Sequence, residues 1–218
     1  MENLLDPAAL PPEHRLALAY APRAGRTIFW GLFALDARLA GIVRSNREPL
    51  LAQLRMAWWR DRLDAPIAPD GGGEPLLALL HNWGEERAAL TALIDGWEAL
   101  LGAAPLDHAA LAEFAAGRAA ACAALSRQLG HPEHADAAYR AGTNWAWADL
   151  AARVSHPDER AAAIAALGLA DWGELALPRT LRPLAVLNAL AHRGRNGSGL
   201  LAGMGSMVVA LRVGMFGK

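Results

Sequence analysis

The sequence contains few of the residues on which common functional sites are built. Cys122 is the only cysteine among the 218 residues, which excludes both a disulfide within the chain and a cysteine-based metal site. Serines are few, none lies in a G-x-S-x-G turn, and no G-x-x-x-x-G-K-[ST] loop is present. The sequence therefore gives no support for a serine nucleophile or a nucleotide-binding loop.

Long apolar runs are also missing. The longest uncharged stretch, residues 196–211, is interrupted by glycines and is shorter than the ~18–20 residues that cross a bilayer. The opening residues, MENLLDP, have neither a basic start nor an apolar segment of signal-peptide length. The only lysine, Lys218, stands beside many arginines, as is typical of GC-rich codon usage. We therefore expect a bacterial, cytoplasmic protein.

Acidic residues are absent after Glu174, where six cations occur. Because the whole chain has a net charge of −1, residues 1–174 carry −7. The balanced total gives no reason to expect a nucleic-acid partner. A basic, apolar C-terminal segment can contact an anionic membrane surface or an acidic protein partner. Alternatively, these cations cap helices and pair with earlier acids. The six cations are Arg179, Arg182, Arg193, Arg195, Arg212 and Lys218.

What the sequence does have is alanine and helical periodicity. Hydrophobic residues make up 54% of the chain and charged residues 20%, and alanine is abundant whereas β-branched residues are scarce. Apolar residues recur every three or four positions in several stretches, and none alternates as a strand would. We predict an all-α, antiparallel helical bundle that forms one domain over residues 1–218. The expected helices are 13–22, 26–44, 48–63, 85–101, 107–129, 132–153, 158–167, 170–175, 180–193 and 200–216.

Asp36 is a carboxylate within an otherwise apolar helical stretch. An unpaired buried carboxylate costs several kcal/mol of folding free energy, so this side chain needs a partner or a polar surrounding. We expect an ion pair with Arg55 or Arg60 as the first choice. A polar cavity facing Asp36 is the alternative.

The tryptophans form two closely spaced pairs, Trp58 with Trp59 and Trp145 with Trp147. Adjacent side chains on a helix point about 100° apart. We therefore expect each pair to place one ring in the core and the other elsewhere. Two such helices facing each other would line an apolar tunnel, whereas ordinary core packing is the alternative.

Other polar pairs are interpreted as surface residues. His131 and His134 lie close together, without a third ligand expected nearby, and acids one helical turn apart occur at 95/98 and 171/174. Such acid pairs can bind a hard cation, but they usually lie on solvated helix faces. We therefore predict no metal ligands among them.

Residues 14–63 resemble the opening of the squalene/phytoene synthase family. Its members have an L-Y-A-F-x-R-x-x-D-x-x-x-D helix, then a loop with proline, then a helix that ends in W-R-x-x-L. Leu32-Phe33-Ala34 is similar to L-Y-A, and Trp59-Arg60 with Leu63 is similar to W-R-x-x-L. The resemblance implies the isoprenoid synthase type of helical bundle.

The resemblance continues more loosely to about residue 193. Phe114 and Gly117 fall where the family has a Y-x-x-x-G helix, residues 142–153 fall at its second acidic helix, and Leu177-Pro178 resembles the L-P that follows. The family ionises prenyl diphosphates and joins the two chains, with Mg²⁺ held by aspartates of two helices.

The family's metal-binding aspartates have no counterparts here. The first pair falls at Ala40 and Arg44, and the second falls near Arg153 and Pro157. An arginine ~5 Å from a divalent cation costs roughly 7 kcal/mol at an effective dielectric constant of 20. We therefore expect no catalytic residues, no metal ligands and no cofactor.

Three functions remain open. The first is a pseudoenzyme with an assembly, scaffolding or membrane-surface role, peripheral at the inner membrane, similar to the degenerate branch that includes a complex I assembly factor of phytoene-synthase type. The second is an active prenyltransferase of squalene, phytoene or carotenoid biosynthesis with an atypical, Mg²⁺-dependent site, in which arginines hold the diphosphate. The third is a non-catalytic binder of a long apolar lipid. Candidate anion-binding or tunnel residues are Phe33, Asp36, Arg44, Arg47, Trp59, Arg60, Trp145 and Asp149.

Overall fold

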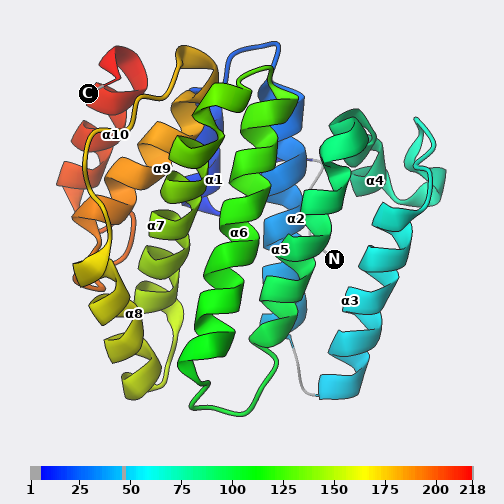
Figure 1. Cartoon of the computed structure of the whole chain (residues 1–218), viewed down its shortest axis with the longest axis horizontal. Coiled ribbons are helices and arrows are strands. Elements are labelled where there is room, and N and C mark those ends of the chain that lie inside the picture. The colour runs from blue at the N-terminus through cyan, green and yellow to red at the C-terminus, as the bar shows by residue number, and fades with distance from the viewer. Residues whose placement is uncertain (1–5, 46–47, 218) are drawn as a thin grey trace.

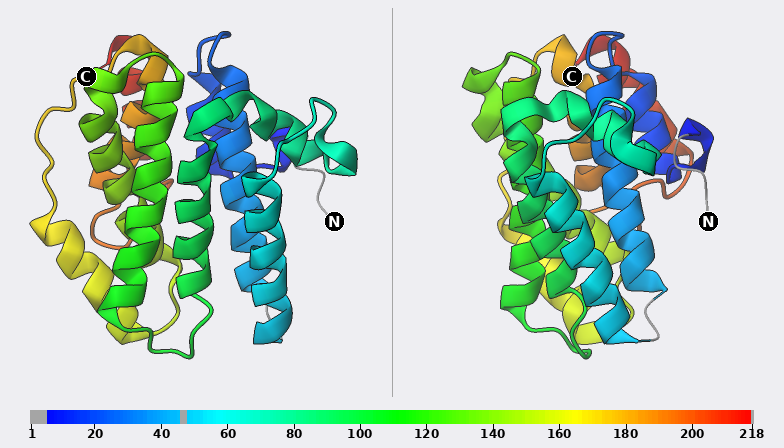
Figure 2. Two further views of the ribbon diagram at one scale, coloured as in Figure 1. Left: turned by 45° about the vertical axis from the view of Figure 1, so that its right-hand side comes forward. Right: turned by 90° about the vertical axis from the view of Figure 1, so that its right-hand side faces the viewer.

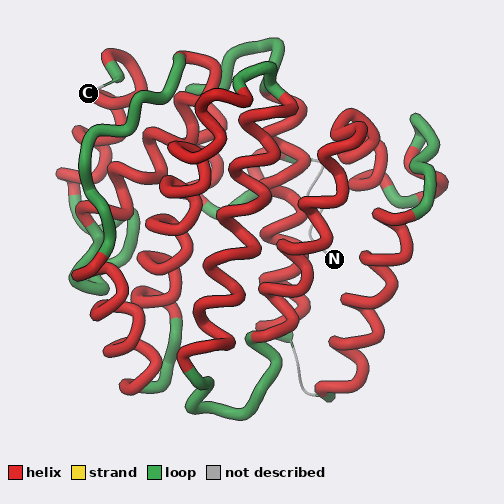
Figure 3. Tube along the Cα trace, in the orientation of Figure 1, coloured by secondary structure: helices red, strands yellow, loops and turns green. Residues whose placement is uncertain are grey.

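All regular structure in the described residues, 6–45 and 48–217 of a computed structural model, is helical (Figures 1 and 3). This confirms the all-α prediction. The α-helices are α1 (Pro12–Ala19), α2 (Arg26–Arg44), α3 (Pro49–Asp64), α4 (Pro75–Leu80), α5 (Ala88–Ala99), α6 (His108–Gln128), α7 (Ala135–Arg153), α8 (Pro157–Leu169), α9 (Arg182–Arg193) and α10 (Met204–Phe216). Short 3₁₀ helices are η1 (Pro7–Ala9), η2 (Gly71–Gly73), η3 (His81–Arg87), η4 (Pro132–His134) and η5 (Arg179–Leu181).

Helix starts follow local capping chemistry. The Asp107 side chain caps α6 by accepting a hydrogen bond of 2.8 Å from the backbone N–H of Ala110. Proline occupies the first turn of α1, α3, α8 and α9, where its missing N–H leaves no hydrogen bond unmade. The boundaries of α2 match the predicted range of 26–44.

Two segments differ from the prediction. The unpredicted helix α4 begins at Pro75, and the Glu74 side chain caps it by accepting from the backbone of Leu76. The expected helix over residues 170–175 is absent. There the Asp171 side chain accepts from the backbone N–H of Gly173, and the Asp171 carbonyl accepts from Asn144. These bonds replace those of a helix.

The long helices lie side by side as a bundle. Figure 1 shows α5, α6 and α7 running up and down next to one another, with α3 at one edge of the molecule and α10 at the other. Helix α3 packs directly against α5 and also against α2, as the two views of Figure 2 show. One cluster of buried apolar side chains extends from Leu10 through all ten α-helices to Val213.

The central helices α5, α6 and α7 approach each other closely at glycines. A Cβ atom added to Gly96 would lie 2.9 Å from the Cα atom of Phe114, and one added to Gly142 would lie 2.8 Å from the Cα atom of Ala119. Gly117 faces the backbone carbonyl of Ala92 in the same way. The glycines therefore let three backbones meet where larger residues would separate them.

One described helix, α6, is long and apolar enough to cross a membrane. Its apolar window is 67% buried inside the bundle, however, as expected for a core helix.

Candidate functional site

The centre of the bundle contains three charged side chains from three helices. Arg118 of α6 donates two hydrogen bonds to Asp36 of α2, at 3.1 and 3.0 Å, and a third to Asp149 of α7, at 3.1 Å. The guanidinium thus bridges the two carboxylates, and all three residues are buried. We call Asp36, Arg118 and Asp149 the buried ion triad.

Further polar contacts satisfy Asp36. The indole N–H of Trp97 donates to its Oδ1 atom at 2.9 Å, and the Nε2 atom of His14 lies 3.7 Å from its Oδ2 atom. Burial lowers the pKa of His14, although Asp36 and Glu13 oppose that shift. His14 is therefore neutral near pH 7.

Aromatic rings enclose the guanidinium of Arg118. Its Cζ atom lies 4.1 Å from the centre of the Trp145 ring, 4.5 Å from that of Phe114 and 5.4 Å from that of Trp97. Phe33 packs edge-on against Trp145 with ring centres 6.0 Å apart. This surrounding excludes water, so the charges rely on one another.

Arg153 connects the buried ion triad to the surface. Its guanidinium donates to Asp149, one helical turn earlier on α7, and to Glu13 of α1. Burial would raise the pKa of Asp149, but the positive charges of Arg118 and Arg153 lower it below its ordinary value. Asp149 is therefore ionised.

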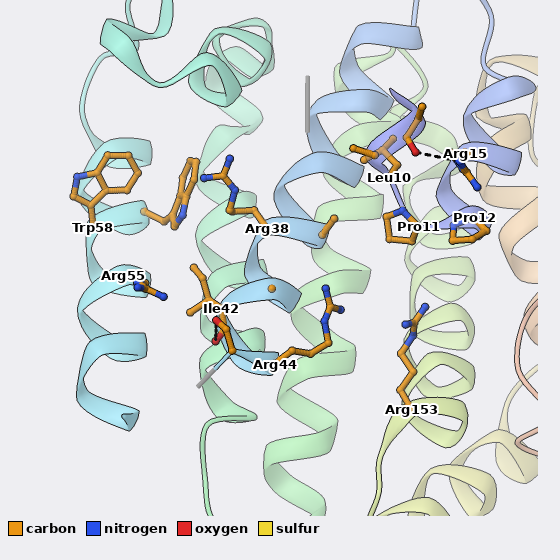
Figure 4. A pocket seen from close by; sticks show the side chains of 16 residues that line it. Leu10, Pro11, Pro12, Arg15, Arg38, Ile42, Arg44, Arg55, Trp58 and Arg153 are labelled. Carbon is orange, nitrogen blue, oxygen red and sulfur yellow. Dashed lines mark hydrogen bonds between the residues drawn. The ribbon is translucent and has the colours of Figure 1, made fainter. Parts of the chain in front are cut away.

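A pocket of about 920 Å³ lies between η1, α1, α2, α3 and the end of α7, and Arg153 belongs both to its lining and to this network. Figure 4 shows its arginines arriving from opposite walls, with Arg55 on α3, Arg44 on α2 and Arg153 on α7. No carboxylate is found among the described residues that line it. We call it the arginine pocket. Its charged residues are Arg15, Arg38, Arg44, Arg55 and Arg153, and its larger apolar ones are Leu10, Pro11, Pro12, Ile42, Trp58 and Trp59.

The pocket arginines differ in how far they are neutralised. Arg153 is paired as above, Arg38 lies 3.6 Å from a Glu74 oxygen, and Arg15 donates to the Ala8 carbonyl at 3.0 Å. Arg44 and Arg55 are exposed, and neither has an acidic partner within residues 6–45 and 48–217. The pocket therefore holds uncompensated positive charge.

Four of the eight candidate anion-binding or tunnel residues lie in the buried centre of the helical bundle and not in the arginine pocket. Phe33, Asp36, Trp145 and Asp149 are all buried around Arg118. The expectation that Asp36 is paired is correct, but the predicted partners Arg55 and Arg60 are wrong. Its partner is Arg118, which lies 82 residues away in sequence.

The other candidates lie on or near α2 and α3. Arg44 and Trp59 line the arginine pocket, whereas Arg60 binds Asp95 and Glu98 of α5 instead. The acids at 95/98 thus form an interhelical contact, not a fully solvated face as predicted. Arg47 lies outside the described residues.

The tryptophan prediction is correct for one pair only. Trp59 is buried and Trp58 is 39% exposed, whereas Trp145 and Trp147 are both buried. Packing of α6, α8 and α9 around α7 leaves neither side of that helix free. Trp59 lines the arginine pocket, whereas Trp145 packs against the guanidinium of Arg118 and is not part of that lining.

A third candidate ligand does lie beside the two neighbouring histidines. The carboxylate of Glu133 is 3.3 Å from Nδ1 of His131 and 3.5 Å from Nε2 of His134. His131 and His134 are half-buried and Glu133 is exposed, and the three side chains could together hold a metal ion. The prediction that no third ligand is near was wrong, because the turn of η4 brings Glu133 back between the rings.

Comparison with protein families supplies the deciding observation. The squalene/phytoene synthase model matches residues 12–170, which include α1 to α8 and every residue of the buried ion triad. The chain belongs to the squalene/phytoene synthase family. A search of curated proteins and a search of solved structures each gave no match.

By the sequence resemblance, the family's first aspartate pair falls at Ala40 and Arg44 and its second falls near Arg153 and Pro157. Arg44 and Arg153 both line the arginine pocket. The two nearby carboxylates that remain, Asp36 and Asp149, already accept hydrogen bonds from arginine guanidinium groups. Mg²⁺ needs carboxylate oxygens that are free to coordinate it, so these residues do not fit the family's metal site.

Proposed function

We propose that this member of the squalene/phytoene synthase family is a pseudoenzyme that binds a phosphate-bearing apolar molecule without a divalent cation. One observation carries the proposal: the arginine pocket has five arginines, and no carboxylate, among its described lining residues. Such a lining attracts an anion and repels a metal cation.

Arginine suits a phosphate in particular. Its planar guanidinium presents paired N–H donors that match two phosphate oxygens, and the resulting bonds are stronger than neutral ones. Arg44 and Arg55 extend from different helices and lack acidic partners in the described chain. Binding a phosphate there breaks no existing ion pair.

The apolar half of the ligand is suggested by the rest of the lining. Leu10, Ile42, Trp58 and Trp59 contribute apolar surface to the same pocket. A volume of about 920 Å³ is at the upper end of what small-molecule sites occupy. It offers room for a chain of many carbon atoms beside the phosphate group.

The absence of catalysis follows from the electrostatics of the leaving group. A diphosphate departs readily only when cations neutralise the charge that develops on it. Arg44 and Arg153 can bind the negatively charged diphosphate, but they provide no ligand for the metal ions on which the family's reaction depends. We propose that the pocket binds its ligand and leaves it intact.

A binding protein without turnover fits an assembly or scaffolding role, as in the family's degenerate branch. A deletion strain tests this role. Unchanged isoprenoid products together with a defect in a membrane complex would support it, whereas lost isoprenoid products would contradict it.

Calorimetry tests the binding proposal directly. Farnesyl diphosphate, geranylgeranyl diphosphate and inorganic pyrophosphate are titrated into the protein in EDTA. We expect binding of the prenyl compounds, with weaker binding of pyrophosphate because it lacks the apolar part. The R44Q/R55Q variant should bind at least about tenfold more weakly, since each charged hydrogen bond contributes about 1.5–3 kcal/mol.

The matched control is Arg26→Gln. Arg26 is exposed at the opposite end of α2 and does not line the arginine pocket. Its replacement should leave the dissociation constant unchanged. Equal loss of affinity in R26Q and R44Q/R55Q, or no binding in EDTA, would disprove the proposal.

The active-enzyme alternative is tested in the same samples. Incubation with either prenyl diphosphate and Mg²⁺ should give no squalene-like or phytoene-like product. A product that forms with Mg²⁺ and disappears with EDTA would establish an active prenyltransferase instead.

A further inference from the structure

Helix α10 carries a stripe of large apolar side chains on its outer surface. Met204, Met207, Val208, Leu211 and Met215 are between 53% and 89% exposed. Their spacing of three or four residues places them on one side of the helix. We call these five residues the α10 stripe.

The opposite side of α10 is already used for packing. Ser206, Ala210 and Val213 are buried, and Gly214 lies against the ring of Tyr20 from the end of α1. The helix is therefore apolar on both sides, although only one side meets the protein. A helix that is apolar all round is normally covered all round.

Two exposed cations flank the α10 stripe. Arg212 is on the helix itself, and the guanidinium of Arg193 lies against Gly205 in the first turn. A third, Arg182, lies against Gly217 at the end of the helix but is itself buried. None of these three has an ion pair with an acid in the described chain, so the predicted pairing with earlier acids is wrong for them. The predicted position at a helix end is correct for Arg193, which lies in the last turn of α9. No acidic residue follows Glu174.

The length of α10 decides how it can meet a bilayer. Its 13 residues extend about 20 Å, which is less than the about 30 Å of a hydrocarbon core. The helix cannot span, but it can lie in the interface with its apolar side toward the lipid tails. Arginines beside and at the ends of such a helix reach the phosphate groups.

We propose that the α10 stripe docks on an anionic lipid bilayer, with α10 parallel to the membrane plane. Both requirements of an interfacial helix are present, namely an unpaired apolar side and neighbouring positive charge. The docking surface contains no residue of the arginine pocket, so this proposal does not depend on the proposed ligand.

Vesicle flotation tests the proposal with the full chain. The vesicles are phosphatidylcholine alone, or phosphatidylcholine with about one third phosphatidylglycerol. We expect binding to the anionic vesicles, weakened by salt, and much less binding to the neutral ones. Arg212→Gln should lower the partition coefficient on anionic vesicles about fivefold.

Three double variants distinguish membrane binding through the α10 stripe from binding through other surfaces. M207Q/L211Q removes apolar area from exposed positions, so its thermal stability should match that of the wild type while its binding falls at least about tenfold. L50Q/L54Q is the matched control, since Leu50 and Leu54 are similarly exposed on α3. R44Q/R55Q tests binding through the arginine pocket. We expect L50Q/L54Q and R44Q/R55Q to float with anionic vesicles to the same extent as the wild type.

Several outcomes would overturn the docking proposal. They are no flotation of the wild type, equal flotation of M207Q/L211Q and wild type, or flotation lost only in R44Q/R55Q. Concentration-dependent dimers in gel filtration that M207Q/L211Q abolishes would assign the stripe to a second copy of the chain instead.

Discussion

The guanidinium of Arg118 lies 4.1 Å from the centre of the Trp145 ring, from the neighbouring helix α7. On its edge the same group binds the carboxylates of Asp36 and Asp149. A single side chain of α6 thereby contacts both α2 and α7 at the centre of the bundle. Its side chain is buried and does not line the arginine pocket.

Removing Arg118 should destabilise the protein strongly. Arg118→Met would leave two buried carboxylates without their shared partner, and we expect a loss of about 3–5 kcal/mol in the free energy of unfolding. The triple variant D36L/R118M/D149L buries no unpaired charge there and should recover part of that loss. Urea denaturation measures the free energy of unfolding of both variants. A triple variant less stable than R118M would contradict this account.

Replacing Gly117 or Gly168 with alanine should change the stability of the protein in opposite directions. Gly117→Ala places a Cβ atom against the Ala92 carbonyl and should force α5 and α6 apart, at a loss of about 1–3 kcal/mol. Gly168 of α8 has open space at the same position, so Gly168→Ala should add up to about 1 kcal/mol through helix propensity. Thermal melts of the two variants provide the comparison. Similar effects of the two changes would show that backbone approach is not the cause.

Stability should fall as the pH drops below about 6.5, the ordinary pKa of a histidine side chain. The pKa of buried His14 is lowered on folding, so the unfolded chain binds this proton first. That difference favours the unfolded state by up to about 1.4 kcal/mol for each pH unit below that value, until the folded pKa is reached. His14→Phe should lose less stability than the wild type between pH 7.5 and 5.5 in urea titrations. Parallel curves for the two proteins would exclude His14 as the source.

Cys122 should be inert in the folded protein. Burial raises the pKa of its thiol from 9.0 to about 12, so that the thiolate fraction near pH 8 falls about a thousandfold. Reaction with a thiol reagent such as dithionitrobenzoate should be fast in denaturant and slow without it. Gly117→Ala should accelerate the native reaction by loosening the packing around α6. Equal rates for native and denatured wild type would show that the thiol is accessible.

The sequence predicts where helices lie better than it predicts which side chains pair with each other. The periodicity and caps of residues 26–44 and 107–129 are local, and the structure places α2 and α6 there. The pairing of Asp36 depends on which helix packs against it, and a partner 82 residues away leaves no periodic signal. The one local signal is Arg118 itself, which is the lone charge among the alanines of G-R-A-A-A-C.

The arginine pocket was only partly predictable for the same reason. Arg44 could be found because the family resemblance aligned it with an aspartate. Arg55 and Arg15 come from helices whose relative positions are set by tertiary packing, so that their meeting follows only from the structure.

The glycines at positions 96, 117 and 142 also have a mechanical consequence. Because α5, α6 and α7 contact one another at backbone level, we expect these three helices to resist displacement relative to each other. Helix α3, which lines the arginine pocket, has several exposed side chains and is linked to α5 by the ion pairs of Arg60. If a bulky ligand widens the pocket, we expect α3 to move outward while α5, α6 and α7 keep their relative positions.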